Sequence, residues 1–482
     1  MTESISQKPF YGREPELTKL GECLRRKKAD LIVIKGRRRI GKSRLAKEFA
    51  NRAEKTGYQT IVLSGMAPGP HSKQDEYEDF AQQLAQECDI PPPRADNWNQ
   101  LLWALADRVK AGNFIVILDE INWMGSKDPT FLAKLKNAWD RYFSETPHLI
   151  LILSGSLAGW IELNILKSTG FLGRITLDIS LQELPLADCN KFWGQRESRI
   201  SAYEKLQLLS VTGGIPRYLE EIDTSQTASD NLRRMCFEPE GILFREFDNL
   251  FADLFSRRQS IYKEIITAIA VEPTELSTLY EKLERPKSGY LSEYVDDLEK
   301  NGFISRDFTW SLKTGKQSKY SHLRLTDNYL RFYLRYVQPI KNKIERGSLK
   351  NLPNVAGILG LQFENIVLKN RATIWELLNL SVDQIVYDNP YFQRPTKRRR
   401  GCQIDYAIQS SSNTLYICEL KFKKTAIQSS IIDEMQDKIN AIDKPENTNI
   451  RPVLIHVNGV SQSIIDSDYF DEIIDFGQLL QG

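Results

Sequence analysis

The stretch DLIVIKGRRRIGKSRLAKEFA, residues 30–50, decides the fold of the amino-terminal part of the chain. It opens with a short apolar run, Leu31–Ile34, whose β-branched residues predict a buried strand. It ends with apolar residues at helical spacing, Leu45 and Phe49. The residues between them, 36–43, read GRRRIGKS and match the pattern GxxxxGK[ST]. The sequence therefore predicts a strand, a glycine-bounded loop and a helix in direct succession.

This loop has the composition of a phosphate cradle. We expect its backbone N–H groups to curl around the β-phosphate of ATP at the positive end of the following helix. Lys42 would reach the β- and γ-phosphate oxygens, and Ser43 would ligate Mg²⁺. The alternative is a glycine turn that happens to precede a lysine, and the flanking strand and helix argue against it. The residues expected at the nucleotide are Gly36, Arg37, Arg38, Arg39, Ile40, Gly41, Lys42, Ser43 and Arg44.

Two further apolar runs end in polar residues. NFIVILDEINWM, residues 113–124, predicts a strand followed by Asp119, which would hold the Mg²⁺ shell, and Glu120, which would polarise the attacking water. HLILILSGS, residues 148–156, delivers Ser154 and Ser156 at its end. Ser156 either contacts the γ-phosphate or the attacking water, or begins an ordinary loop.

The remaining elements of this region complete an α/β pattern. Residues 59–64 and 175–179 predict two more strands, and residues 130–144 predict one of the helices between strands. Strands that alternate with helices form a parallel sheet with helices on both faces. The fold class expected is therefore α/β, with a P-loop parallel sheet as the ATPase core.

Six motifs carry a resemblance to a known family. They are FYGREPEL at 10–17, GRRRIGKS, LDEINWM, LSGS, FLGR at 171–174 and TGGIPRYL at 212–219. In this order they resemble the archaeal-type ATPase family, which belongs to the AAA+/STAND branch of P-loop nucleotidases, over residues 8–345. The resemblance implies that Gly12 and Arg13 lie beside the nucleotide base. It also implies roles for Arg174 as a γ-phosphate or finger arginine, and for Pro216 and Arg217 as a second sensor. Arg174 and Arg217 are equally open to the interpretation of surface ion-pair residues.

The middle of the chain predicts a winged-helix (α+β) domain. Residues 258–308 predict three helices and a strand, and the lysines 313, 316 and 319 lie near the tip of a hairpin. The third helix, about Ser288–Asn301, would be the recognition helix. Asp296, Asp297 and Glu299 on that helix would repel phosphates, so a regulatory or packing role is the alternative to DNA contact.

The carboxy-terminal quarter predicts a hairpin that carries paired charges. The polar turn SSSN separates QIDYAI from TLYICELKF, with a midpoint near Ser412. Asp405 and Glu419 lie seven residues to either side and fall opposite one another, within reach of a shared cation. Lys421 is two residues from Glu419 on the same face. Carboxylates suit Mg²⁺ or Mn²⁺, and the lysine would offset charge in the transition state.

Asp405…Glu419-Leu-Lys421 resembles the PD-(D/E)XK nuclease superfamily over roughly residues 350–482. The resemblance implies an α/β restriction-endonuclease-like domain, with Glu364 on the preceding helix as a further metal ligand. Ile404 stands before the aspartate, where the family pattern has proline. The basic run KRRR at 397–400 suits a phosphate backbone or is an exposed loop. Degenerate copies of this fold bind without cutting.

The composition bounds these interpretations. The chain has 482 residues, which predicts two to four domains, and we place them at 1–222, 223–347 and 348–482. With 41% hydrophobic and 27% charged residues it is typical of a globular protein, and its net charge of +2 requires any basic surface to be local. The six cysteines form no CxxC pair and the four histidines do not cluster. No signal sequence or membrane span is expected, so we expect a cytoplasmic protein without a membrane partner.

Two functions follow from these patterns. The first is an ATP-hydrolysing ATPase coupled to a metal-dependent, DNA-directed nuclease domain. The second is a STAND-type regulatory or scaffold ATPase whose carboxy-terminal domain binds without cutting. Both use ATP or ADP with Mg²⁺, and Mn²⁺ is an alternative at the nuclease-like site. The partners expected are DNA and, through the resemblance, a further copy of the chain or another protein.

Overall fold

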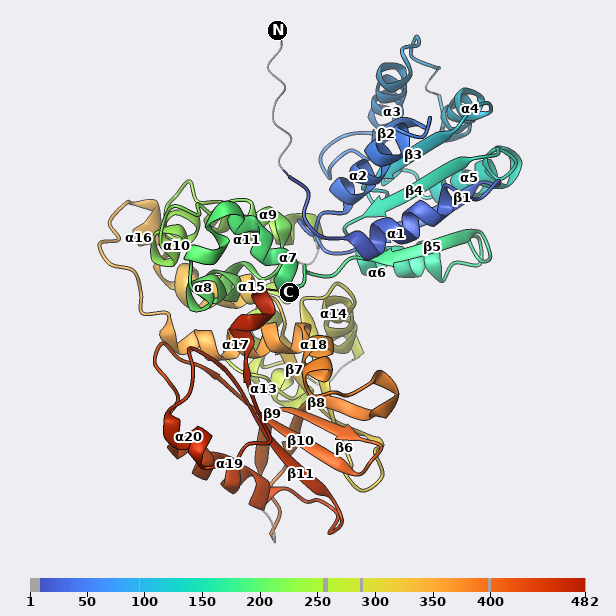
Figure 1. Cartoon of the computed structure of the whole chain (residues 1–482). Coiled ribbons are helices and arrows are strands. Elements are labelled where there is room, and N and C mark those ends of the chain that lie inside the picture. The colour runs from blue at the N-terminus through green and yellow to red at the C-terminus, as the bar shows by residue number, and fades with distance from the viewer. Residues whose placement is uncertain (1–8, 95, 255–258, 287–288, 398–399, 482) are drawn as a thin grey trace. The chain divides into compact units, whose positions relative to one another are not determined.

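The computed structural model describes residues 9–94, 96–254, 259–286, 289–397 and 400–481. Contacts within the chain divide it into two compact units, which Figure 1 colours along the sequence. Unit 1 comprises Met1–Leu184 with Ile215–Arg217, and unit 2 comprises Pro185–Gly214 with Tyr218–Gly482. This division begins unit 2 earlier than the domain boundary that we place after residue 222. The three domain ranges therefore stay a prediction.

Unit 1 contains the predicted parallel sheet. Its five strands have the order β2-β3-β4-β1-β5 and are all parallel. The α/β fold class is thus confirmed for this part of the chain. The strands are β1 (Asp30–Lys35), β2 (Gln59–Ser64), β3 (Phe114–Asp119), β4 (Leu149–Gly155) and β5 (Ile175–Ser180).

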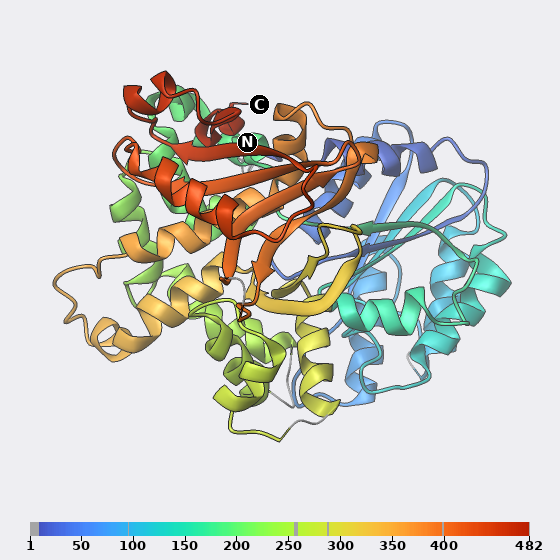
Figure 2. The ribbon, with the colours of Figure 1, turned by 90° about the horizontal axis from the view of Figure 1, so that it is seen from below.

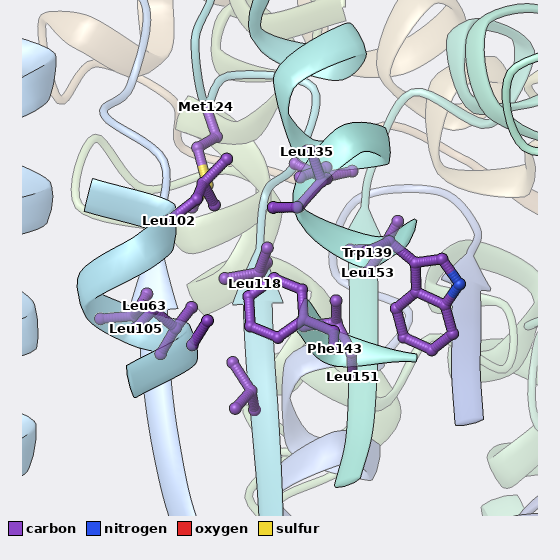
Figure 3. Packing of buried hydrophobic residues seen from close by; sticks show 14 of the residues in the cluster. Leu63, Leu102, Leu105, Leu118, Met124, Leu135, Trp139, Phe143, Leu151 and Leu153 are labelled. Atoms are coloured by element: carbon purple, nitrogen blue, oxygen red, sulfur yellow. The ribbon is translucent and has the colours of Figure 1, made fainter. Parts of the chain in front are cut away.

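Helices cover this sheet and bury an apolar core. Figure 3 shows leucines of the strands, such as Leu118 and Leu153, packed against Leu102 and Leu135 from two helices. β1, β3 and β4 carry almost entirely buried side chains, because strands in the middle of such a sheet are covered on both faces. The helices are α1 (Glu14–Cys23), α2 (Lys42–Glu54), α3 (Lys73–Cys88), α4 (Trp98–Val109), α5 (Phe131–Ala138), which continues as η1 (Trp139–Phe143), α6 (Ala158–Ile161) and η2 (Glu162–Leu166).

The first part of unit 2 is helical and leads to a two-stranded hairpin. The antiparallel strands β6 (Ile304–Trp310) and β7 (Gln317–Leu325) follow three helices, in the predicted order. Ser288, where the recognition helix was predicted to begin, lies outside the described residues, and the helix itself is α14 (Gly289–Lys300). The other helices are α7 (Leu186–Asn190), η3 (Lys191–Arg199), α8 (Ala202–Thr212), α9 (Pro216–Leu219, which begins in unit 1), α10 (Ala228–Cys236), α11 (Ile242–Leu254), α12 (Gln259–Ile269) and α13 (Leu276–Lys282).

Unit 2 ends in a mixed sheet with the order β12-β11-β10-β9-β8. β8, β9 and β10 are antiparallel neighbours, and β11 and β12 join parallel to β10. Figure 2 shows these strands, orange to red, side by side. The strands are β8 (Ile385–Gln393), β9 (Cys402–Ser410), β10 (Thr414–Phe422), β11 (Asn449–Val457) and β12 (Glu472–Asp475). The helices after β7 are α15 (Asn328–Phe332), η4 (Tyr333–Val337), η5 (Gln338–Ile340), α16 (Lys341–Glu345), α17 (Ala356–Lys369), α18 (Arg371–Leu377), η6 (Val382–Gln384), α19 (Ser430–Ala441), α20 (Gln462–Asp466) and η7 (Phe476–Leu480).

Aromatic contacts tie this sheet to earlier parts of unit 2. Trp310 of β6 stacks on Tyr387 of β8 with 4.6 Å between ring centroids, and its Nε1 donates to Gln409 Oε1 at 2.7 Å. Tyr203 of α8 stacks on Phe422 of β10 at 4.9 Å. The contact of Tyr203 links residues 185–214 to the carboxy-terminal sheet, although the chain places them directly after the parallel sheet.

None of the helices in the described ranges is long and apolar enough to span a membrane. β8 and β12 were not among the predicted strands. β8 contains Pro390, which removes a ladder donor and disguises the strand pattern, and β12 has only four residues.

Candidate nucleotide site and candidate nuclease-like site

The loop 36–43 runs from the end of β1 to the start of α2, as predicted. A Cβ added at Gly36 would lie 2.8 Å from the Leu181 backbone oxygen, so only glycine fits there. Gly41 caps α2 with φ +96°, a conformation that glycine adopts without strain. The two glycines of the motif therefore serve the close approach of another backbone segment and the turn into the helix.

Lys42 lies inside this loop and is 4% exposed. Its Nζ donates to the Arg37 backbone oxygen at 3.1 Å. Burial lowers the pKa of Lys42, and the nearby Glu120 and Asp119 carboxylates oppose that shift. The positive charges of Arg38 and Arg37 also act on Lys42 and lower its pKa further. A phosphate group would relieve this crowding of positive charge, because it supplies the missing anion.

Asp119 is the last residue of β3 and is buried, and its Oδ1 accepts from Glu120 N at 3.1 Å. Glu120 has φ +49°, which is rare for a non-glycine residue and is concentrated at functional sites. Its Oε2 accepts from Ser156 Oγ at 2.8 Å and from Ser156 N at 3.2 Å. The structure thus brings Glu120 and Ser156 together, as expected of residues that follow β3 and the neighbouring β4.

Asn122 is a residue of this edge that sequence reasoning missed. Its Oδ1 accepts from Ser156 N at 3.2 Å, beside the bond from that N–H to Glu120. Among the described residues, Asn122 Nδ2 and Ser154 Oγ are buried without a hydrogen-bond partner. Unsatisfied buried polar atoms are rare, and here they lie at the edge where a nucleotide phosphate and its metal are predicted. The position of Asn122, two residues after Glu120, was the available signal.

Other residues of the loop are buried or contact neighbouring segments of the chain. Ile40 is fully buried, and Arg37 lies 3.9 Å from Glu183. Arg44 donates to the Pro9 backbone oxygen at 2.8 Å. Ser43 is half-buried at the first turn of α2. The predicted contacts of these residues with a nucleotide stay predictions.

Gly12 and Arg13 both adopt positive φ, +73° and +67°. Arg13 is 7% exposed, and its Nη2 donates to the Ile40 and Gln182 backbone oxygens at 3.2 and 2.6 Å. Arg13, the residue directly before α1, therefore holds the backbone of the loop through its hydrogen bond to Ile40. A position for both residues beside the base is compatible with this placement and stays a prediction.

Pro216 adjoins the loop. Its Cγ would lie 3.8 Å from a Cβ at Gly41. Ile215–Arg217 cluster with unit 1, whereas the chain on both sides of them belongs to unit 2. Arg217 is half-buried in this short segment. The predicted second-sensor position is therefore next to the phosphate loop.

Arg174 has other partners. Its Nε and Nη2 donate to the two carboxylate oxygens of Asp140 at 2.6 and 2.9 Å, and its Nη1 donates to the Leu172 oxygen. This guanidinium holds the pKa of Asp140 at about 2. Neither partner is a predicted site residue, so the structure favours the ion-pair interpretation of Arg174 over the finger.

In unit 2 the predicted hairpin is confirmed. The register pairs Cys418 with Tyr406 across β9 and β10, and the next step outward sets Glu419 opposite Asp405. Asp405 Oδ2 also accepts from Leu420 N at 3.1 Å. Burial and the Glu419 charge raise the pKa of Asp405. The two carboxylates therefore lie close together and repel each other; Glu419 is buried and Asp405 is partly buried.

Lysines compensate these carboxylates. Lys421 Nζ lies 2.8 Å from Glu419 Oε1, and Lys438 Nζ of α19 lies 2.5 Å from Glu419 Oε2 and 3.7 Å from Asp405 Oδ1. Lys438 was missed from the sequence. Its signal was the spacing of Ile431, Met435, Lys438 and Ile442, which places a lysine in an apolar helical stripe.

Glu364 is close enough to respond to this site. Burial and the Asp405 charge raise the pKa of Glu364, and Arg324 and Arg331 oppose the shift. Within the described ranges, no three His, Cys, Asp or Glu side chains are arranged to hold a metal ion. Lys438 Nζ lies 3.7 Å from Asp405 Oδ1 and 2.5 Å from Glu419 Oε2, and the role of Glu364, Asp405 and Glu419 as metal ligands stays a prediction. The carboxylate oxygens of Asp405 and Glu419 are of the type that divalent cations prefer as ligands, and the Lys438 ammonium lies beside them.

Comparisons with known proteins find one family match and one similar relative for this chain. Residues 10–222 match the model of an ATPase domain that occurs predominantly in Archaea. The chain is 26% identical over 341 residues to the uncharacterized protein MJECL04 of Methanocaldococcus jannaschii, which covers 70% of this chain and 71% of that protein.

Two solved structures are similar. The Walker-type ATPase PABY2304 of Pyrococcus abyssi is 20% identical with a TM-score of 0.49, covering 68% of this chain and 96% of its own. The ORC2 protein of Aeropyrum pernix, in ADPNP-ADP complexes, is 16% identical with a TM-score of 0.46, covering 71% and 97%. Residues 10–222, which contain the phosphate loop, are therefore similar to an ATPase domain of the archaeal type.

Proposed function

We propose that the chain binds and hydrolyses ATP at the loop 36–43 and that its nucleotide state controls a metal-dependent, DNA-directed nuclease-like domain in residues 348–482. The ATPase part is supported by the family match and by the geometry of the loop. The nuclease-like part is supported by one observation above all. Asp405, Glu419 and Lys421 lie together on one face of the central strands of the carboxy-terminal sheet.

At the nucleotide site, the N–H groups at the start of α2 bind the phosphates, and Lys42 pairs with their oxygens. Ser43 and Asp119 would hold Mg²⁺, which when bound neutralises charge that develops on the transferred phosphoryl group. Glu120 accepts a hydrogen bond from Ser156 in this structure, so it must exchange that donor for a water molecule before it can orient the attack. Asn122 is placed to hold Ser156 when Glu120 turns away.

At the nuclease-like site, Asp405 and Glu419 would hold Mg²⁺ or Mn²⁺, which would supply Lewis-acid activation of water and of a phosphodiester. Lys421 would offset negative charge on the phosphate. Its Nζ is shared by Glu419 and Glu434, whose oxygens lie 2.8 and 3.0 Å away. Burial lowers the pKa of Lys421, but these two carboxylates outweigh burial and raise it. Lys421 therefore stays protonated and serves as a charge, not as a base.

Basic residues of unit 2 support DNA as the partner. Lys313, Lys316 and Lys319 are exposed around the turn of the β6–β7 hairpin and are available to phosphates. The acidic residues of α14 are partly neutralised, since Asp296 and Glu299 pair with Arg306 at 2.8 and 3.5 Å. An isolated antiparallel bridge joins Thr274, which precedes α13, to Leu323 of β7, and this contact supports a winged helix. Arg398 and Arg399 of the predicted KRRR run lie outside the described residues.

A regulatory platform that binds without cutting is the second candidate. It is favoured by the pairing of both Glu419 oxygens with lysines. A degenerate nuclease domain has no need to leave its carboxylates open to a metal. In this case the nucleotide state would control a protein or nucleic-acid interaction of unit 2.

The test measures ATP hydrolysis and cleavage of single- and double-stranded DNA, with Mg²⁺ or Mn²⁺ and with or without ATP. Lys42→Ala should abolish ATP turnover while the far-ultraviolet circular dichroism stays native, and full turnover in that variant contradicts the phosphate-loop assignment. Glu419→Ala should abolish DNA cleavage and leave ATP turnover intact. An intact ATPase with no cleavage under any condition supports the platform instead.

A further inference from the structure

The helix α19 presents a charged side chain where its packing pattern calls for an apolar one. Ile431 and Met435 are buried in the carboxy-terminal core, with Ile442 on the same stripe. Lys438 occupies the position between Met435 and Ile442, so its stem lies against the sheet and its ammonium ends at the hairpin carboxylates. A lysine in this stripe is costly to bury unless its charge is compensated.

Two residues of α19 interlock with the hairpin. Glu434 pairs with Lys421, and Lys438, one turn later on the same helix face, pairs with Glu419. Each carboxylate oxygen of Glu419 therefore pairs with one ammonium group. Oε1 pairs with Lys421, and Oε2 pairs with Lys438. Glu419 is 3% exposed, so water does not replace these partners.

We infer that Lys438 is an internal cation that holds the divalent-metal position between Asp405 and Glu419 and must withdraw before a metal ion can bind there. The inference rests on the proposed metal-binding role of these carboxylates. An ammonium 2.5 Å from Glu419 Oε2 and 3.7 Å from Asp405 Oδ1 satisfies the charge that a metal would satisfy. Both cations cannot occupy the same few ångströms, because like charges at that separation repel strongly in a buried site.

The side chain of Lys438 can leave without unfolding the helix. It is 25% exposed, unlike Glu419, and its four-carbon stem can turn the ammonium toward water. Lys438 therefore lowers the metal affinity of the site without removing the site. It is a positioning residue for metal occupancy, and binding of a partner that moves α19 would open the site.

The test titrates Mn²⁺ into the nucleotide-free full chain, with electron paramagnetic resonance as the readout of free Mn²⁺. Lys438→Met removes the charge and keeps the length of the side chain, and we expect a dissociation constant at least about tenfold lower than that of the wild type. Lys438→Arg should behave like the wild type. Lys424→Met, on an exposed lysine near the same hairpin, is the matched control and should not change the affinity.

Glu419→Gln separates this inference from the proposed function. In both the wild-type and the Lys438→Met background it should remove the Mn²⁺ ion that binds at this site. Equal affinity in the wild type and Lys438→Met, with loss in Glu419→Gln, overturns the role of Lys438 and retains the metal site. No Mn²⁺ binding that depends on Glu419 in any background overturns both. If Lys438→Met does not fold, Lys438→Gln, which can still donate to Glu419, answers the same question.

Discussion

The nucleotide site and the nuclease-like site use the same residue types in opposite ways. In each, a lysine lies near two carboxylates that follow or belong to a strand. Lys42 donates to a backbone oxygen, and Glu120 accepts from a serine. Lys438 instead pairs directly with Glu419, as does Lys421. The first arrangement keeps lysine and carboxylates separate for a phosphate and its metal, whereas the second neutralises its carboxylates internally. Residue composition alone therefore does not say which site is ready for a ligand.

The largest difference between the two sites is expected in the rate of ATP hydrolysis when the same Glu→Gln change is made at each of them. Glu120→Gln should lower the rate of ATP hydrolysis by about 100-fold or more, because it removes the group that orients and polarises the attacking water. Nucleotide binding should remain, since the phosphates are held by the loop and Lys42.

Glu419→Gln should leave ATP hydrolysis unchanged, and phosphate release with fluorescent-nucleotide binding measures both effects. A similar loss of ATP hydrolysis in Glu419→Gln would show that the two sites are not chemically separate.

An Asp→Asn change should affect the free energy of unfolding differently at two aspartates, one in each unit. Asp128 of unit 1 accepts from Thr130 N and Oγ1 at 3.0 and 2.6 Å and pairs with Lys73 and Lys134, both at 3.0 Å. Burial raises its pKa, but these donors outweigh burial and hold the pKa well below the ordinary value. Asp128→Asn should therefore destabilise the protein by about 2 kcal/mol at pH 7. Asp405→Asn, which removes one of two repelling charges and keeps an acceptor for Leu420 N, should be neutral or stabilising by about 1 kcal/mol.

The pH dependence of the Asp128 effect follows from its depressed pKa. The stabilisation is complete above the ordinary aspartate pKa of about 3.9 and is lost only as the pH falls toward the lower pKa of the folded protein. Thermal melts of wild type and Asp128→Asn should thus differ equally from pH 8 to about pH 5 and converge only in stronger acid. Convergence at neutral pH would show that the lysines do not stabilise the carboxylate.

The smallest effect is expected at Arg174. Its ion pair with Asp140 is partly exposed, with 28% and 33% of the two side chains accessible. Asp140→Asn should therefore change the stability by less than about 1 kcal/mol and the ATPase rate by less than about twofold. Arg174→Ala is the companion variant. A large loss of ATP turnover in Arg174→Ala, with none in Asp140→Asn, would return Arg174 to the role of a γ-phosphate or finger arginine.

The elements with strong local signals were predicted well. The five parallel strands, the loop 36–43 and the β9–β10 hairpin were all expected from apolar runs, glycines and a polar turn. β8 was missed because Pro390 hides its pattern, and Asn122 was missed because its position two residues after Glu120 is not a specific signal.

The interaction of α19 with the hairpin could not be predicted, since the partner of Lys438 is 19 residues away and another lysine, Lys421, offered a simpler pairing.

The sequence by itself determined the phosphate loop and the pairing of Asp405 with Glu419. It also determined which functional residues follow which strand along the chain. Each depends on local spacing, because a loop between strand and helix and a two-stranded register follow from neighbours in sequence. The tertiary structure alone decided the partners of Arg174, the pairing of Ser156 with Glu120, and the placement of Lys438 between two carboxylates. Those are outcomes of burial and charge compensation between elements that are distant in sequence, and they decide which ligand each site can accept.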